Sequence, residues 1–261
     1  MKFSEIKSDA RESLKGNWGK GVAFVAANIL IIFAFTFLTS FILGMFLSEE
    51  MADFVIEIIS LIFSIPIGYG IIAQFIKLRR GKDVHAFDFL SIGLSNFKKS
   101  WAVAWAVTEK FALLIILLVL YIVGIPALAL TAQSNAIVGI IVLIIFVAFL
   151  VTLILSVPKC YSYALVWFVA YDNPDMKAKE IVEKSKEIIY GNRMNYFLFG
   201  LSFIGWALLN VLTLGIGSLW LVPYMNVGIT CFYERLAGIP TQHIEENKDN
   251  EPHEESNNPI A

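Results

Sequence analysis

Lys159 is the residue whose type and position most invite a chemical role, because it interrupts an apolar stretch. No charged residue occurs from Phe111 to Pro158, and Lys159 follows directly. If this stretch is a membrane helix, an ionisable group within it costs ~2.5 to 3.5 kcal/mol on insertion scales. Lys159 would therefore need a charged partner, water or a path to the surface, and it is a candidate intramembrane site residue.

Glu109 is the candidate partner of Lys159. Counted inward from the expected helix ends at ~1.5 Å per residue, both lie ~20 Å deep, so an ion pair is geometrically feasible. In a second interpretation, residues 97–110 form an amphipathic segment at the membrane interface and the third crossing begins at Phe111. Lys159 would then face a water-filled vestibule or extend along its helix to the surface. The sequence leaves both interpretations open.

Asn226 is the third candidate intramembrane polar residue. It lies three positions beyond a proline, as Tyr69 and Tyr161 do, and the three could meet in a polar cluster. In the simpler interpretation, such side chains bond to the neighbouring backbone of packed membrane helices.

No catalytic constellation of a soluble enzyme is present. The three histidines lie in a basic loop and in or near the C-terminal tail, at positions 85, 243 and 253. The chain has no phosphate-binding loop, no dinucleotide-binding turn and no metal-ligand spacing. We therefore expect no enzymatic activity, no cofactor and no metal site. The basic cluster at 77–82 directly follows an apolar run, which favours contact with phospholipids over nucleic acid.

The elements that would position these residues are membrane helices. Hydrophobic residues make up 57% of the chain and charged residues 16%, a balance more apolar than a soluble core requires. The charge-free runs 111–158 and 194–233 can each hold two crossings of ~20 residues. Runs 22–47 and 54–76 add one crossing each. This predicts an all-α integral membrane protein with about six transmembrane helices.

The distribution of Lys and Arg predicts the orientation. Basic residues gather in segments 2–20, 77–99 and 177–193, whereas the alternate loops carry none. Because basic loops stay in the cytoplasm, both termini are expected there, in a protein of the cell membrane in contact with its lipids. Residues 239–261 hold six acidic residues against one lysine and are expected to form a disordered cytoplasmic tail.

A pattern repeated around three prolines divides residues 1–238 into three units, at about 1–81, 82–173 and 174–238. Pro66, Pro158 and Pro223 each stand ~18 Å before an expected cytoplasmic helix end, near mid-bilayer. Each unit would comprise an interfacial amphipathic helix, a turn, an outward helix and a return helix with the proline. The turns are predicted at three similar motifs: Leu14-Lys15-Gly16-Asn17-Trp18, Gly93-Leu94-Ser95-Asn96-Phe97 and Ile189-Tyr190-Gly191-Asn192-Arg193.

The amphipathic helices show three stripes at helical spacing. The members of these stripes are Phe3, Ile6, Ala10 and Leu14; Val84, Phe87, Ser91 and Leu94; and Ala178, Ile181, Val182, Ser185, Ile188 and Ile189.

The C-terminal half contains several distinctive motifs: Tyr171-Asp172-Asn173-Pro174, Ser185-Lys186-Glu187-Ile188-Ile189-Tyr190-Gly191-Asn192, Leu201-Ser202-Phe203-Ile204-Gly205-Trp206 and Leu212-Thr213-Leu214-Gly215-Ile216-Gly217. These motifs resemble an uncharacterised family of bacterial membrane proteins, domain of unknown function 975. The chain departs from the family at Ser156-Val157-Pro158-Lys159, where the family tends to have Ile-Pro-Gly-Ile. The family looks related to membrane domains found beside glycerophosphodiester phosphodiesterases, but the resemblance carries over no activity and no catalytic residue.

The sequence therefore favours a membrane-embedded accessory or scaffold protein, with a protein partner bound through its cytoplasmic helices or tail. The alternative is a transporter or lipid-handling protein, motivated by the repeats, the prolines and Lys159. A membrane enzyme acting on lipid headgroups ranks last, because the sequence shows no acid, base or metal cluster for it.

Overall fold

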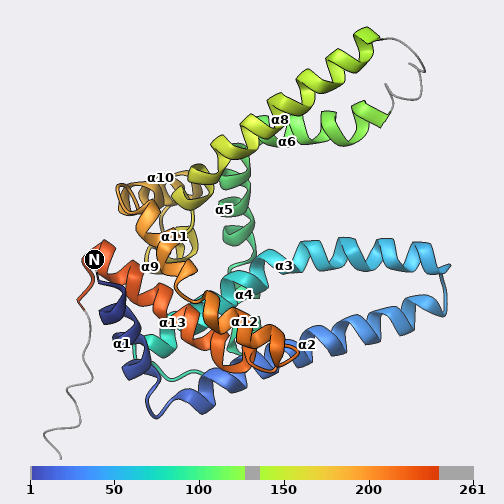
Figure 1. The fold of residues 1–261 in the computed structure, drawn as a ribbon. Coiled ribbons are helices and arrows are strands. Elements are labelled where there is room, and N and C mark those ends of the chain that lie inside the picture. The colour runs from blue at the N-terminus through green and yellow to red at the C-terminus, as the bar shows by residue number, and fades with distance from the viewer. Residues whose placement is uncertain (1, 127–135, 241–261) are drawn as a thin grey trace, which may run out of the picture.

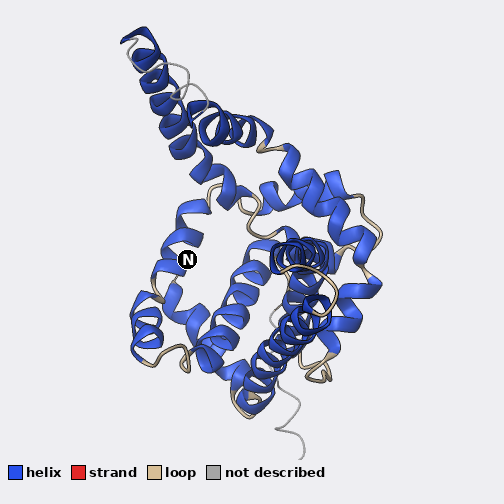
Figure 2. Cartoon of the chain, turned by 90° about the vertical axis from the view of Figure 1, so that its right-hand side faces the viewer, coloured by secondary structure: helices blue, strands red, loops and turns tan. Residues whose placement is uncertain are grey.

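The computed structural model describes residues 2–126 and 136–240, and all regular structure in these ranges is helical (Figure 1 and Figure 2). The predicted all-α class is confirmed. The helices in chain order are α1 (Phe3–Leu14), α2 (Trp18–Gly44), α3 (Glu49–Arg79), α4 (Asp88–Ser95), α5 (Phe97–Glu109), α6 (Ala112–Val119), the π-helical turn η1 (Leu120–Gly124), α8 (Ala136–Ser162), α9 (Val166–Asp172), α10 (Ala178–Ile188), α11 (Arg193–Leu201), α12 (Ile204–Leu212) and α13 (Ser218–Ala237).

Four helical segments among the described residues are long and apolar enough to cross a membrane. They are α2, α3, residues 137–172 and residues 193–212. The pair formed by α5 and the helix from Ala112 to Gly124 gives a fifth if counted as one span, but it bends by 72°. The expected sixth crossing, α13, is not among them, because Asn226, Glu234 and Arg235 make it too polar. The count of six stays a prediction.

Two helical hairpins carry most of the exposed large apolar side chains. The first hairpin comprises residues 29–63 of α2 and α3, and the second comprises the described part of residues 112–157. Both hairpins project from the remaining helices (Figure 1). An exposed apolar surface of this extent is unstable in water and suits the interior of a bilayer.

The prolines of α3 and α8 stand near the border between hairpin and protein interior. In α3 the helix beyond Pro66 is largely buried, from Tyr69 to Arg79. In the segment after Pro158, burial begins at Ser162 and continues through α9. The return helices thus leave the exposed hairpins at about the prolines and enter a packed core formed by their C-terminal parts.

The helices pack in a cyclic order. α1 and α2 contact α13, α4 and α5 contact α3, and α10 and α11 contact α9 and α8 respectively. In each case an amphipathic helix and the outward helix after it rest on the return helix of the preceding unit. For the first unit this return helix is α13 of the last unit, which closes the cycle. The three-unit division stays a prediction.

The predicted turn motifs coincide with helix boundaries. Asn17, Asn96 and Asn192 immediately precede α2, α5 and α11. Gly16 and Gly191 adopt φ of +81° and +76°, a left-handed conformation that glycine tolerates without strain.

Gly93 differs from those two glycines. It lies inside α4, where a Cβ atom would come 2.5 Å from the carbonyl oxygen of Pro66. The stripe predicted for this segment is also wrong, since Phe87 and Leu94 are exposed while Phe89 and Gly93 are buried. Close contact of α4 with the α3 backbone, rather than the largest apolar side chains, decides which face is buried.

Candidate functional site

Lys159 lies on the exposed surface of α8. Within the described residues, no hydrogen bond or ion pair reaches its ammonium group. The structure therefore leaves Lys159 beside the second hairpin rather than inside a polar cavity.

Glu109 is exposed at the end of α5, and its carboxylate lies 3.7 Å from Nζ of Lys179. The next residue, Lys110, pairs with Glu183 at 2.8 Å. Glu109 therefore pairs with Lys179 rather than with Lys159 in the described structure. The chain turns sharply between α5 and α6, so the third apolar segment starts after Lys110. This geometry agrees with the second interpretation, in which residues 97–110 precede the crossing.

Asn226 is half-buried in α13, and its amide Nδ2 donates to the carbonyl of Val222 at 2.9 Å. This bond to its own helix is the simpler of the two expected roles. The structure does not bring Asn226, Glu109 and Lys159 together.

A different polar cluster joins the C-terminal ends of α3, α9 and α13, and we call it the charge network. Arg80, directly after α3, donates from Nη1 and Nη2 to the two carboxylate oxygens of Asp172, at 2.6 and 3.0 Å. Its Nε donates to Glu234 at 3.0 Å. The hydroxyl of Tyr233 donates to Asp172 at 2.9 Å. One guanidinium group thus connects the ends of three helices that are distant in the sequence.

Arg79 extends the charge network to α1. Its Nη1 donates to the hydroxyl of Ser13 at 2.7 Å, and its Nε lies 3.3 Å from Oε2 of Glu234. The Arg79 and Glu234 side chains are only 6% and 4% exposed. Arg235 adds a second connection between α13 and α1, nearer the surface, because its Nη2 lies 2.6 Å from a carboxylate oxygen of Asp9.

The electrostatics of the charge network favour a structural role. Burial disfavours the positive charge of Arg80, but hydrogen bonds to Asp172 and Glu234 outweigh it, and the pKa of the guanidinium lies above its ordinary value. Bidentate pairing of this kind fixes the direction of both side chains. Both acids are paired with arginines, and Asp172 also accepts a hydrogen bond from the Tyr233 hydroxyl. No group of three metal-ligating side chains occurs in the described ranges.

The sequence reasoning missed the charge network. Arg79 and Arg80 were assigned to a phospholipid-facing cluster, whereas both are turned into the protein. The available signal was charge of opposite sign at the ends of the proline-bearing helices, at Arg80, Asp172 and Glu234. Charged residues at the edge of a membrane domain are usually solvated, so the residue types alone did not distinguish pairing from exposure.

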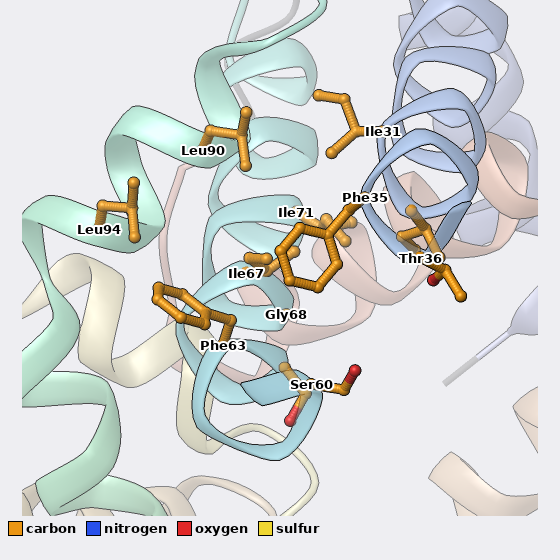
Figure 3. Close-up of a pocket in the computed structure, with 12 residues that line it drawn as sticks. Ile31, Phe35, Thr36, Ser60, Phe63, Ile67, Gly68, Ile71, Leu90 and Leu94 are labelled. Carbon is orange, nitrogen blue, oxygen red and sulfur yellow. The ribbon is translucent and has the colours of Figure 1, made fainter. Parts of the chain in front are cut away.

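An apolar groove lies beside the first hairpin, between α2, α3 and α4 (Figure 3). It has a volume of about 430 Å³. Phe35 of α2 and Phe63 of α3 line it, Leu90 and Leu94 close one side, and Gly68 leaves its floor without a side chain (Figure 3). Its lining suits a hydrocarbon chain and offers no charged group.

Comparison with known proteins agrees with the motifs. No curated protein and no solved structure matches the chain. A family model described as "Protein of unknown function (DUF975)" matches residues 1–239, which include every described helix. The chain therefore belongs to the DUF975 family, whose function is unknown.

Proposed function

We propose that this protein is an accessory or scaffold protein of the cell membrane, which holds a partner through the surface of its helical core. The charge network carries the proposal. Buried charges that neutralise one another stabilise one arrangement of α3, α9 and α13 and are unavailable for chemistry. A core fixed in this way and anchored by apolar hairpins suits a binding platform better than a moving carrier.

The surface of α10 is a suitable place to test partner binding. Tyr190, just after α10, is 76% exposed and adjoins the charged side chains Glu183, Lys186 and Glu187. A photo-crosslinking amino acid at position 190 should give one adduct of defined mass in intact cells. The matched control is Phe46, which is similarly exposed but lies at the far end of the first hairpin, and it should not give this adduct.

A transport assay could contradict the scaffold function. If the purified chain alone moved a solute across reconstituted vesicles, and Lys159→Leu abolished the flux, the scaffold function would be wrong. We expect Lys159→Leu to leave stability unchanged or higher, because the exposed ammonium has no described partner to lose.

The apolar groove favours lipid handling as a second candidate function. A groove open to the first hairpin can hold one acyl chain, and its floor at Gly68 has free space for a larger side chain. Gly68→Phe should reduce the amount of lipid that copurifies in native mass spectra. Gly44→Phe is the control, because Gly44 also has free space but lies outside the groove. Equal lipid content in both variants would remove this candidate.

A further inference from the structure

The segment from Phe203 to Pro223, which we call the third hairpin, has an unusual tip. Residues 211–217 carry no charge, and Leu214 is 94% exposed with a φ of +51°. Val211, Leu212 and Ile216 are strongly exposed as well. The tip of the first hairpin, in contrast, carries Glu49, Glu50 and Asp53, as a turn in water or headgroups should. The third hairpin therefore presents an apolar tip where the first presents a charged one.

The third hairpin is also short. A contact between α2 and α13 gives a common level from which the lengths of the first and third hairpins can be compared. Gly21 of α2 packs on Pro223 so closely that a Cβ atom at position 21 would lie 2.9 Å from the proline Cβ. From this level α2 continues to Gly44, a rise of about 35 Å at ~1.5 Å per residue. From Pro223 back to the start of α13 at Ser218, the rise is only about 8 Å.

The outward leg of the third hairpin is also too short to cross a bilayer from this level. The ring of Phe203 lies 5.2 Å from that of Tyr224, so this leg starts near the same level. From Phe203 to Leu212 the chain can rise at most about 14 Å. The hydrocarbon core of a bilayer is ~30 Å thick. Measured from this common level, the first hairpin reaches across it and the third hairpin does not, although residues 193–212 taken as one segment are long and apolar enough to span.

Polar groups of the tip form hydrogen bonds within the protein. Hydrocarbon offers no hydrogen bonds, so polar groups of a turn must be satisfied within the protein. The amide of Gly215 donates to the carbonyl of Asn210 at 2.9 Å, and that of Gly217 donates to the hydroxyl of Thr213 at 3.0 Å. The hydroxyl of Ser218 donates to the carbonyl of Gly215 at 2.6 Å.

We propose that the third hairpin is a re-entrant membrane anchor. Its tip enters the hydrocarbon of the leaflet nearest the helical core and returns to the same side, and its partner is the acyl-chain region of that leaflet. The chain then crosses the membrane with the first and second hairpins only. This replaces the two crossings that hydropathy predicts between residues 194 and 233, and it is independent of the scaffold function.

Cysteine labelling of the full-length protein in native membranes tests the proposal. The background is Cys160→Ser with Cys231→Ala, checked for unchanged yield and melting temperature. The test variant is Leu214→Cys. Ser48→Cys, at the tip of the first hairpin, and His85→Cys, in the exposed loop after α3, mark the two sides. A membrane-impermeant maleimide should label each marker from one side only. It should label Leu214→Cys from neither side until detergent is added.

A spin label supplies a positive signal in the same variant. At Leu214 it should be more accessible to oxygen, which concentrates in hydrocarbon, than to a water-soluble nickel chelate. Labelling of Leu214→Cys from the Ser48 side would show a full crossing, and labelling from the His85 side would show a surface loop. Either result, or greater access to the chelate, would overturn the proposal.

Discussion

Arg80 is the residue whose loss should most affect the fold. Arg80→Met would leave the partly buried Asp172 without a cation and the buried Glu234 with Arg79 alone. Removing one partner of a buried pair costs about 3 to 5 kcal/mol, so we expect a clear fall in melting temperature in detergent. Arg80→Lys should recover only part of it, because an ammonium cannot replace the bidentate bonds.

Lys82→Met is the matched control for Arg80→Met. Lys82 is an exposed cation close to Arg80 in the chain, so its substitution removes the same charge without opening the charge network. Equal melting temperatures of the Arg80→Met and Lys82→Met variants would contradict the stabilising role of the network.

The membrane class could be predicted from the sequence, but the pairing within the charge network could not. The apolar runs and the basic loops indicate a membrane protein, since both follow from composition along the chain. Pairing of Arg80 with Asp172 depends on three helix ends meeting in space, and no local pattern encodes that distance. Lys159 is a candidate site residue because it is an isolated charge in the sequence, yet the structure leaves it on the surface.

The backbones of α3 and α4 approach each other very closely where the two helices cross, and this contact leads to a specific prediction. A Cβ atom at Gly70 would come 2.0 Å from the carbonyl oxygen of Phe89. Gly70→Ala should force the helices apart and destabilise the protein by about 1 to 3 kcal/mol, in the range of overpacking substitutions. The measurement is thermal unfolding in detergent.

Gly68 on the same helix provides the control for Gly70. A Cβ atom at Gly68 meets nothing within 4 Å, so Gly68→Ala should be neutral or stabilising by up to about 1 kcal/mol through helix propensity. If Gly70→Ala were as stable as Gly68→Ala, the close approach of α4 to α3 would be wrong.

The contact of α5 with α10 should depend on pH. The hydrogen bond from Lys110 holds the pKa of Glu183 below its ordinary value of about 4.3. A lowered pKa in the folded state means that the pair stabilises above this ordinary value and is lost as pH falls through the lowered one. The side chains are 40% and 46% exposed, so the effect should not exceed about 1 kcal/mol.

A double-mutant cycle isolates this Lys110 to Glu183 interaction. Lys110→Met and Glu183→Gln should show a coupling energy at pH 7 that declines on acidification below pH 4 and in high salt. A coupling that persists unchanged at pH 3 would show that the contact is not an ion pair.

Helix boundaries were more predictable than buried faces. Asn and Gly residues at the turn motifs act through local backbone conformation, so the starts of α2, α5 and α11 follow from sequence. The buried face of α4 does not, because it is set by the shape of α3 around Pro66. Ile6, Ala10 and Leu14 of α1 are buried as their spacing indicates, since α1 rests on a broad surface of α13.

The whole molecule combines a packed helical core with hairpins of unequal length. Hydropathy alone predicts two crossings in each of the runs 111–158 and 194–233, because it measures composition and not where a helix lies. The C-terminal part of α13 is buried against other helices, so its place relative to the bilayer is set by packing as well as by its own hydropathy. The number of crossings therefore depends on tertiary packing, which sequence periodicity does not report.

The orientation of the termini is predicted whichever way the third hairpin lies. A hairpin that crosses twice and one that re-enters both return the chain to the side from which it left. With the first and second hairpins crossing, the N-terminus and Gly238 share one side, and the excess of Lys and Arg predicts that this side is the cytoplasm. A cytoplasm-active reporter after Gly238 should therefore be active, and the same reporter at Ser48 inactive, with a periplasm-active reporter giving the reverse. Activity of one reporter at both positions would mean that an even number of crossings separates Ser48 from Gly238, and the hairpin architecture, which requires an odd number, would be wrong.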